Sequence, residues 1–221
     1  MIRIVLVDDQ ELFRGGVRVA LDAQADLAVV GEAGDGLEAL EVIGRTKPDV
    51  VLLDMRMPVL DGLETVRALY APADGPPPQD PPRVIVLTTF ALDAAAATAI
   101  RAGASGFVLK DATPAFLAAA IRAVHAGNAV LAPDELGQLF GLDVEKAPAP
   151  PPPAQYRTLT ERERTVFDLA ARGLTNTEIA AHEFVSESTV KTHISNVLAK
   201  LGLRNRVQLV VYAHDNRLLG H

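Results

Sequence analysis

The chain has 221 residues, of which 49% are hydrophobic and 22% charged, enough for one large or two ordinary globular domains. It contains no cysteine, which excludes disulfides, thiolate catalysis and cysteine-bound zinc and suits a reducing cytoplasm. No apolar run reaches the roughly 20 residues that cross a bilayer, and the N-terminus has the pattern of a strand rather than a signal peptide. We therefore expect a cytoplasmic protein with no membrane partner.

The net charge of −7 is unevenly distributed along the chain. From residue 155 onward nine Lys and Arg stand against seven Asp and Glu, a net charge of +2, whereas residues 1–154 carry −9. Such asymmetry predicts two parts with different partners. A net charge of +2 does not by itself indicate nucleic-acid binding, so the positions of the charges must decide.

Apolar runs alternate with helical patterns through the first part of the chain. We predict strands at 2–7, 27–30, 50–53, 84–87 and 106–109, and helices around 13–21, 37–43, 62–69, 94–102 and 116–124. Continuous aliphatic strands separated by helices imply an α/β fold, with a five-stranded parallel (βα)5 sheet covered on both faces. The last helix is expected to bury a stripe made of Phe116, Leu117, Ala120, Ile121 and Val124.

Two proline-rich segments divide the chain. Residues 71–82 hold six prolines and are expected to form an enlarged surface loop without a catalytic role. Residues 147–154 hold five prolines, cannot continue a helix and should form an extended spacer. These breaks predict a first domain at 1–126, a helix end and linker at 127–156, and a second domain at 157–221.

The second domain shows helical signals throughout. "TERE" at 160–163 and "TNTE" at 175–178 match the capping box, in which Thr and Glu satisfy free N–H groups reciprocally. Gly173 fits the end of a helix, while Ser186 and Asn205 fit the starts of two more. We therefore predict an all-α domain of four helices.

Acidic and polar residues follow several of the predicted strands. Asp8 and Asp9 come after the first strand and Asp54 after the third, while Thr88 ends the fourth and Lys110 follows the fifth. The carboxyl ends of parallel strands share one edge of a sheet, so these side chains can converge. Three carboxylates need positive charge, which Mg²⁺ and Lys110 could supply. The set matches the needs of a carboxylate that accepts a phosphoryl group.

Residues 1 to about 125 resemble the flavodoxin-like receiver domain of bacterial two-component response regulators. The resemblance rests on the Asp8-Asp9 pair, Asp54, "MP" at 57–58, "DG" at 61–62, Thr88, Phe107 and "LK" at 109–110. It implies that Asp54 is the phosphoacceptor, assisted by Thr88 and Lys110. It also implies Mg²⁺ ligation by Asp9, Asp54 and the carbonyl of Arg56, with Asp8 acting mostly through water. Thr88 and Phe107 would form the switch, although Phe107 could equally be an ordinary core residue.

Residues 159–213 resemble the LuxR-type helix-turn-helix DNA-binding domain, so that the whole chain resembles the NarL/FixJ architecture. Val190, Ile194, Val197, Leu198 and Leu201 would form the buried face of the longest helix. The resemblance implies that Lys191, Thr192 and Ser195 face the major groove. Candidate phosphate contacts are Asn176, Thr189, His193, Lys200 and Arg206. Val207, Leu209 and Val210 could either pack the domain or form a dimer contact.

These patterns predict a DNA-binding response regulator rather than an enzyme. The expected partners are a sensor histidine kinase, double-stranded promoter DNA and, after phosphorylation, a second copy of the chain. One alternative is a Mg²⁺-dependent phosphotransferase or phosphatase using Asp54, but Arg56 stands where such a phosphatase commonly has a second acid. The other alternative is a DNA-binding regulator that is never phosphorylated.

Overall fold

The computed structural model describes residues 1–70, 81–89, 94–130 and 151–219. The chain divides into two units, Met1–Ala126 and Gly127–His221, which are described separately below.

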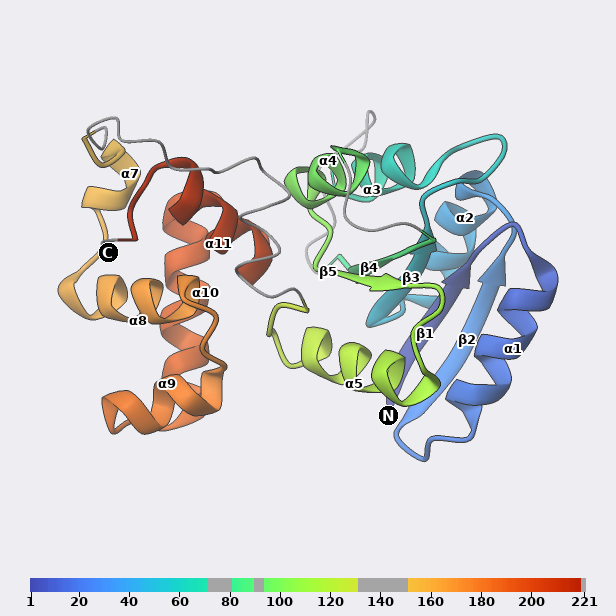
Figure 1. The fold of residues 1–221 in the computed structure, drawn as a ribbon, viewed down its shortest axis with the longest axis horizontal. Helices are drawn as coiled ribbons and strands as arrows, with labels where there is room; N and C mark the ends of the chain where they lie inside the picture. The colour runs from blue at the N-terminus through green and yellow to red at the C-terminus, as the bar shows by residue number, and fades with distance from the viewer. Residues whose placement is uncertain (71–80, 90–93, 131–150, 220–221) are drawn as a thin grey trace. The chain divides into compact units, whose positions relative to one another are not determined.

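A parallel sheet forms the centre of the N-terminal unit (Figure 1). Its strands are β1 (Ile2–Val7), β2 (Leu27–Ala33), β3 (Val50–Asp54), β4 (Arg83–Thr88) and β5 (Gly106–Leu109). They lie in the order β2-β1-β3-β4-β5, with every neighbouring pair parallel. All residues of β3 are buried, as expected for a central strand covered on both faces.

Helices cover both faces of the sheet (Figure 1). α1 (Glu11–Asp22) and α5 (Pro114–His125) contact each other on one face, while α2 (Gly36–Thr46), α3 (Gly62–Tyr70) and α4 (Ala94–Ala102) follow one another on the other face. The connections leaving β1 and β3 therefore run to opposite sides of the sheet. Between these two neighbouring strands lies the switch point at which ligands bind in open α/β folds.

The predicted α/β fold and its five βα units are confirmed. The prediction was wrong for Phe116, whose side chain is 53% exposed. Leu117, Ile121 and Val124 set the buried stripe of α5. Phe116 lies about 100° around the helix from Leu117, beyond the edge of that stripe.

The C-terminal unit is helical. Its elements are α7 (Ala154–Arg157), α8 (Glu161–Ala171), α9 (Asn176–Glu183), α10 (Glu187–Leu201) and α11 (Arg206–Asp215). Both predicted capping boxes are present, at the starts of α8 and α9. The Ser186 and Asn205 side chains accept hydrogen bonds from the first turns of α10 and α11. The short helix α7 was not predicted.

Phe167 lies at the centre of the C-terminal core and is fully buried. Its ring meets Tyr156 and Tyr212 edge-on, with centroids 5.2 and 6.3 Å apart. The apolar face of α10 packs into the same core through Val190, Ile194, Val197 and Leu201. Leu209 of α11 belongs to this core, and Val207 and Val210 are buried too.

The turn between α9 and α10 is tight. Phe184 adopts a left-handed conformation with φ 55°, and its amide donates to the carbonyl of Ala180. This reverses the chain so that α10 crosses α9, which is the helix-turn-helix arrangement. Most of the predicted 71–82 loop and 127–156 linker falls on residues 71–80 and 131–150, outside the described residues.

Candidate phosphoryl site and nucleic-acid interface

The acidic residues predicted to converge lie together at the carboxyl edge of the sheet. Asp8 and Asp9 follow β1, and Asp54 is the last residue of β3. Carboxylate oxygens of all three lie within 4.8 Å of one another. Asp8 and Asp54 are buried, whereas Asp9 is exposed, so the cluster is open to solvent on the Asp9 side.

The Lys110 ammonium joins two of these carboxylates. Its Nζ lies 2.7 Å from Asp8 Oδ2 and 3.0 Å from Asp54 Oδ2, and the lysine side chain is 8% exposed. Burial alone would lower the pKa of Lys110, but hydrogen bonds to Asp8 and Asp54 outweigh burial and raise that pKa. Burial, together with the nearby Asp8 carboxylate, raises the pKa of Asp54, although the Lys110 ammonium opposes that shift. The lysine therefore remains charged and holds both carboxylates.

The donor set fits the Mg²⁺ that the sequence predicts. Among the described residues, one ammonium is ion-paired with this group of three carboxylates, so negative charge predominates in the cluster. A divalent cation would balance that charge, and oxygen ligands from few carboxylates are the ligands that Mg²⁺ prefers.

The loop after β3 fixes where Asp54 emerges. The Asp61 side chain accepts a 2.8 Å hydrogen bond from the amide of Glu64 and so caps the start of α3. The amide of Gly62 donates to the carbonyl of Met55. A Cβ at Gly62 would lie 2.3 Å from the backbone oxygen of Asp54, so the chain can return this closely only with glycine at that position.

A pocket of about 440 Å³ lies over this edge of the sheet. It collects predicted site residues from β3, β4 and β5 and from the loops after β1, β3 and β5: Asp9, Asp54, Arg56, Thr88, Phe107 and Lys110. Phe107 is 6% exposed and forms part of the pocket wall. The residues predicted from separate strand ends therefore share one site, although Phe107 also serves as a core residue.

α10 presents a polar face opposite its buried one. Lys191, Thr192 and Ser195 are exposed on it, as predicted for side chains that enter a groove. Within the described part of the chain Lys191 makes no ion pair or hydrogen bond through its ammonium. Thr192 donates its hydroxyl to the carbonyl of Ser188, which leaves its methyl group and an oxygen lone pair for a ligand.

Two of the candidate phosphate contacts are buried. The side chain of Asn176 is 5% exposed and accepts a 2.9 Å hydrogen bond from Arg206 Nη1. Arg206 is 4% exposed and also donates to the carbonyl of Leu174. Burial lowers the pKa of Arg206 to about 10, and the carboxylate of Glu178 opposes that shift. These two side chains connect helices, and a phosphate contact at Asn176 would use its backbone N–H.

Three further candidates have partners within the unit or are partly enclosed. Lys200 Nζ lies 2.6 Å from Glu163 Oε2. The Thr189 hydroxyl lies 2.9 Å from the Ser186 hydroxyl at the start of α10. His193 is half-buried, and its Nδ1 is enclosed without a hydrogen-bond partner among the described residues. Of the predicted DNA contacts, Lys191, Thr192 and Ser195 are therefore the most accessible.

Comparison with known proteins places both units in families. The family described as "Response regulator receiver domain" matches residues 4–122. The family described as "Bacterial regulatory proteins, luxR family" matches residues 157–213. The chain belongs to the response regulators of two-component systems. It is a DNA-binding response regulator with a receiver and a LuxR-type helix-turn-helix domain, which confirms the resemblance inferred from the sequence.

This response regulator is similar to proteins of the same length. It is 37% identical to the transcriptional regulatory protein LiaR of Bacillus subtilis, covering 99% of this chain and 100% of LiaR. It is 38% identical to the DNA-binding transcriptional activator DevR/DosR of Mycobacterium tuberculosis, covering 97% and 95%. The crystal structure of response regulator ChrA, from a heme-sensing two-component system, is 37% identical, with a TM-score of 0.50, covering 99% and 98%.

Two residues that support the acidic site were missed in the sequence. The amide of Gln10 donates a 2.9 Å hydrogen bond to Asp8 Oδ1, and Arg14 Nη1 lies 2.5 Å from the carbonyl oxygen of Asp8. Arg14 also faces Glu32 of β2. An arginine on an amphipathic helix carries no sign of such a role, because its usual position is a solvated face.

Among the described residues of this response regulator, no helix combines the length and hydrophobicity needed to span a membrane.

Proposed function

We propose that Asp54 accepts a phosphoryl group from a sensor histidine kinase, and that phosphorylation favours a dimer that binds double-stranded promoter DNA. The observation that carries this proposal is the Lys110 ammonium, held 2.7 Å from Asp8 and 3.0 Å from Asp54 in a pocket open to solvent. That arrangement supplies a nucleophilic oxygen and a positive charge beside it.

In the proposed step a carboxylate oxygen of Asp54 attacks phosphorus. The new O–P bond forms as the bond between phosphorus and the donor's nitrogen or oxygen breaks, and the leaving group departs with the bonding electrons. When Asp54 becomes phosphorylated, the Lys110 ammonium can leave the Asp54 carboxylate and bind one phosphoryl oxygen. It can do so while it stays paired with Asp8. Thr88 lines the same pocket, and its hydroxyl can donate a hydrogen bond to another phosphoryl oxygen.

Mg²⁺ belongs to this proposal as the cofactor. Asp9, Asp54 and the carbonyl of Arg56 would bind it, with Asp8 acting mostly through water. The bound ion would neutralise charge on the phosphoryl oxygens as the donor approaches. The clustering of three carboxylate oxygens within 4.8 Å of one another supports this assignment.

The proposed switch couples Thr88 to Phe107. Both side chains line the pocket that contains Asp54, on the adjacent strands β4 and β5. If Thr88 moves toward a phosphoryl group, it vacates space that the Phe107 ring can enter, which gives two discrete packings.

The C-terminal unit is proposed to insert α10 into the major groove. Lys191 can donate to guanine acceptors or phosphate, while Thr192 and Ser195 can contact base edges. Their exposure on the face opposite the buried side of α10 supports this role. DNA and the kinase's catalytic domain would meet the chain in the cytoplasm.

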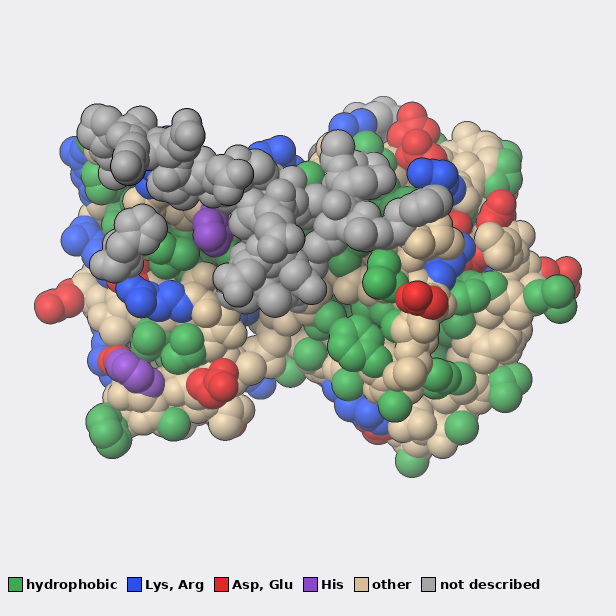
Figure 2. All heavy atoms as spheres, in the orientation of Figure 1, with side chains coloured by type: hydrophobic (Ala, Val, Ile, Leu, Met, Phe, Trp, Pro, Cys, Tyr) green, Lys and Arg blue, Asp and Glu red, His purple; other side chains and the backbone are tan. Residues whose placement is uncertain are grey.

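A dimer is supported by apolar side chains exposed on the N-terminal unit. Leu12 and Val19 on α1 are 94% and 74% exposed, and Leu109 and Phe116 are 44% and 53% exposed. Figure 2 shows hydrophobic side chains gathered over β5 and α5. An apolar group of this kind commonly marks a protein contact.

Phosphorylation is tested by measuring intact mass after incubation with acetyl phosphate and Mg²⁺. The wild-type chain should gain the mass of one phosphoryl group, and Asp54→Asn should gain none. Asp111→Asn removes an exposed carboxylate next to Lys110 and serves as the matched control, which should still be phosphorylated. Undiminished phosphorylation of Asp54→Asn would overturn the assignment.

Dimer formation is tested by analytical ultracentrifugation with and without beryllofluoride, together with titration of promoter DNA. We expect beryllofluoride to raise both the dimer fraction and the DNA affinity, because two linked binding events reinforce each other. Thr88→Ala should weaken both responses. An unchanged monomer fraction and unchanged DNA affinity would contradict phosphorylation control.

A further inference from the structure

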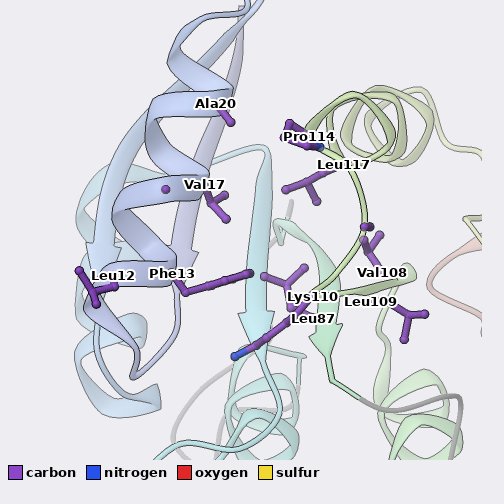
Figure 3. A pocket seen from close by; sticks show the side chains of 12 residues that line it. Leu12, Phe13, Val17, Ala20, Leu87, Val108, Leu109, Lys110, Pro114 and Leu117 are labelled. Carbon is purple, nitrogen blue, oxygen red and sulfur yellow. The ribbon is translucent and has the colours of Figure 1, made fainter.

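An aromatic ring lies close to the Lys110 ammonium. The ring belongs to Phe13, in the first turn of α1, and its centroid lies 4.9 Å from Lys110 Nζ. Figure 3 shows the Phe13 side chain extending from α1 toward Leu87 and Lys110. The ring also forms part of a second pocket, of about 300 Å³, between α1, β5 and the start of α5.

This distance is within the range of a cation–π interaction, in which the negative face of a ring attracts a cation. Water screens that attraction little here, because the lysine side chain is 8% exposed. An ammonium carries three N–H groups, so Lys110 can pair with two carboxylates and still face a ring. A ring at this distance occupies space from which water could otherwise compete with the carboxylates.

We propose that Phe13 is a positioning residue for phosphoryl transfer, because its ring holds the Lys110 ammonium at the acidic cluster. When Asp54 carries a phosphoryl group, the same contact keeps the ammonium aimed at a phosphoryl oxygen. This inference rests on the proposed function of Asp54. It adds a residue from α1 to a site otherwise built from strand ends and the loops after them.

The second pocket gives this contact a further consequence. Most of its lining is apolar, from Leu12 and Val17 of α1 to Val108 and Leu117 on the opposite side. Phe13 and Lys110 belong to the lining as well, and Lys110 also lines the pocket over the acidic cluster. If Lys110 shifts toward a phosphoryl oxygen, the Phe13 ring loses part of its contact with the ammonium. The wall that this ring forms in the second pocket can then move.

Three variants distinguish the effect of the aromatic face of Phe13 from the effect of its side-chain volume. Phe13→Leu keeps apolar volume but removes the aromatic face, whereas Phe13→Tyr keeps that face. Val17→Ala is the matched control, because Val17 lines the same pocket one helical turn further along without being a partner of Lys110. All are made in the full chain.

The first readout is the nuclear magnetic resonance signal of the Lys110 side chain, without Mg²⁺ or a phosphodonor. A ring facing the ammonium shifts the Lys110 Hε resonance upfield, and Phe13→Leu should abolish that shift. Phe13→Tyr and Val17→Ala should retain it. An unchanged Lys110 resonance in Phe13→Leu would overturn the proposed contact.

The second readout is beryllofluoride affinity in the presence of Mg²⁺. Phe13→Leu should weaken it by about threefold to tenfold, the size expected of a partly desolvated cation–π contact, and Phe13→Tyr should restore it. Equal losses in Phe13→Leu and Val17→Ala would show general loosening and overturn the proposal, as would no loss in Phe13→Leu. If the wild-type chain bound no beryllofluoride, the function proposed for Asp54 would fail, and the Lys110 resonance alone would decide the role of Phe13.

Discussion

The Lys200 ammonium lies 2.6 Å from Glu163 Oε2, and this ion pair joins the end of α10 to the first turn of α8. The same carboxylate accepts hydrogen bonds from the backbone and hydroxyl of Thr160 in the capping box. Glu163 is 4% exposed, so the pair is protected from solvent on the acidic side. Lys200 is thus part of what holds the helices of the DNA-binding unit together.

Replacing Glu163 with Gln should destabilise the C-terminal unit by about 1–3 kcal/mol at pH 7, because Gln can still cap α8 but carries no charge. Lys200 and the Thr160 amide lower the pKa of Glu163 from its ordinary 4.5 to about 2. The stabilisation is therefore fully present above pH 4.5 and is lost as pH falls toward about 2. Urea denaturation followed by amide exchange in α8 and α10 should show a smaller difference at pH 3 than at pH 7. The same difference at both values would contradict the assignment.

Lys191→Ala and Lys200→Ala should affect different properties. Lys191→Ala should weaken specific DNA binding by about 1–3 kcal/mol if Lys191 contacts a base, with little change in stability. Lys200→Ala should lower the stability of the unit, because it leaves the Glu163 carboxylate unpaired. Titration of promoter and random duplexes at fixed salt, beside denaturation of each variant, separates the two effects. Unchanged affinity of Lys191→Ala for both duplexes would remove Lys191 from the interface.

Much of the acidic site could be predicted because the topology constrains it. In a parallel sheet every strand end falls on one edge, so acids placed after β1 and β3 must meet. Helix starts could be predicted equally well, because each capping box is local: the Thr and Glu side chains accept hydrogen bonds from each other's backbone N–H groups. No long-range information was needed for either.

The inward-facing polar residues could not be predicted in the same way. Arg206, Asn176 and Lys200 have sequence surroundings like those of a solvated helix face. Their partners lie about 30 or more residues away, at distances along the chain that periodicity does not encode. Phe13 was missed for a related reason, because a ring on an apolar face predicts core packing rather than contact with an ammonium.

Gly62→Ala should disturb the site as well as the fold. The added Cβ would lie 2.3 Å from the Asp54 oxygen and 2.8 Å from Met55 Cα, both backbone atoms that cannot rotate away. We expect a loss of about 1–3 kcal/mol in stability and slower phosphorylation. Gly44→Ala is the control, because nothing lies within 4 Å of its Cβ and alanine favours the helix, so it should stabilise by roughly 0.5–1 kcal/mol. Thermal denaturation and the rate of phosphorylation by acetyl phosphate check both. Wild-type behaviour of Gly62→Ala would contradict the close approach.

Val59→Gly should stabilise the N-terminal unit by about 1 kcal/mol. Val59 has φ 67° in the loop between β3 and α3, and its side chain is 77% exposed. A β-branched residue is strained in the left-handed region, and little packing is lost when this side chain is removed. Val19→Gly is the comparison, since Val19 is also exposed but lies within α1 and should lose stability. Melting temperatures that fall in both variants would argue against strain at Val59.

The buried guanidinium of Arg206 makes folding of the C-terminal unit depend on a residue that is synthesised late. It binds Asn176 and the carbonyl of Leu174, partners 30 and 32 residues earlier in the chain. As the chain is synthesised, α8, α9 and α10 are all finished before Arg206 exists to satisfy these acceptors. The buried contacts beside the capping box of α9 are therefore completed only when α11 docks. A fragment ending at residue 203 should fold less cooperatively than the complete unit, even though it contains the whole helix-turn-helix.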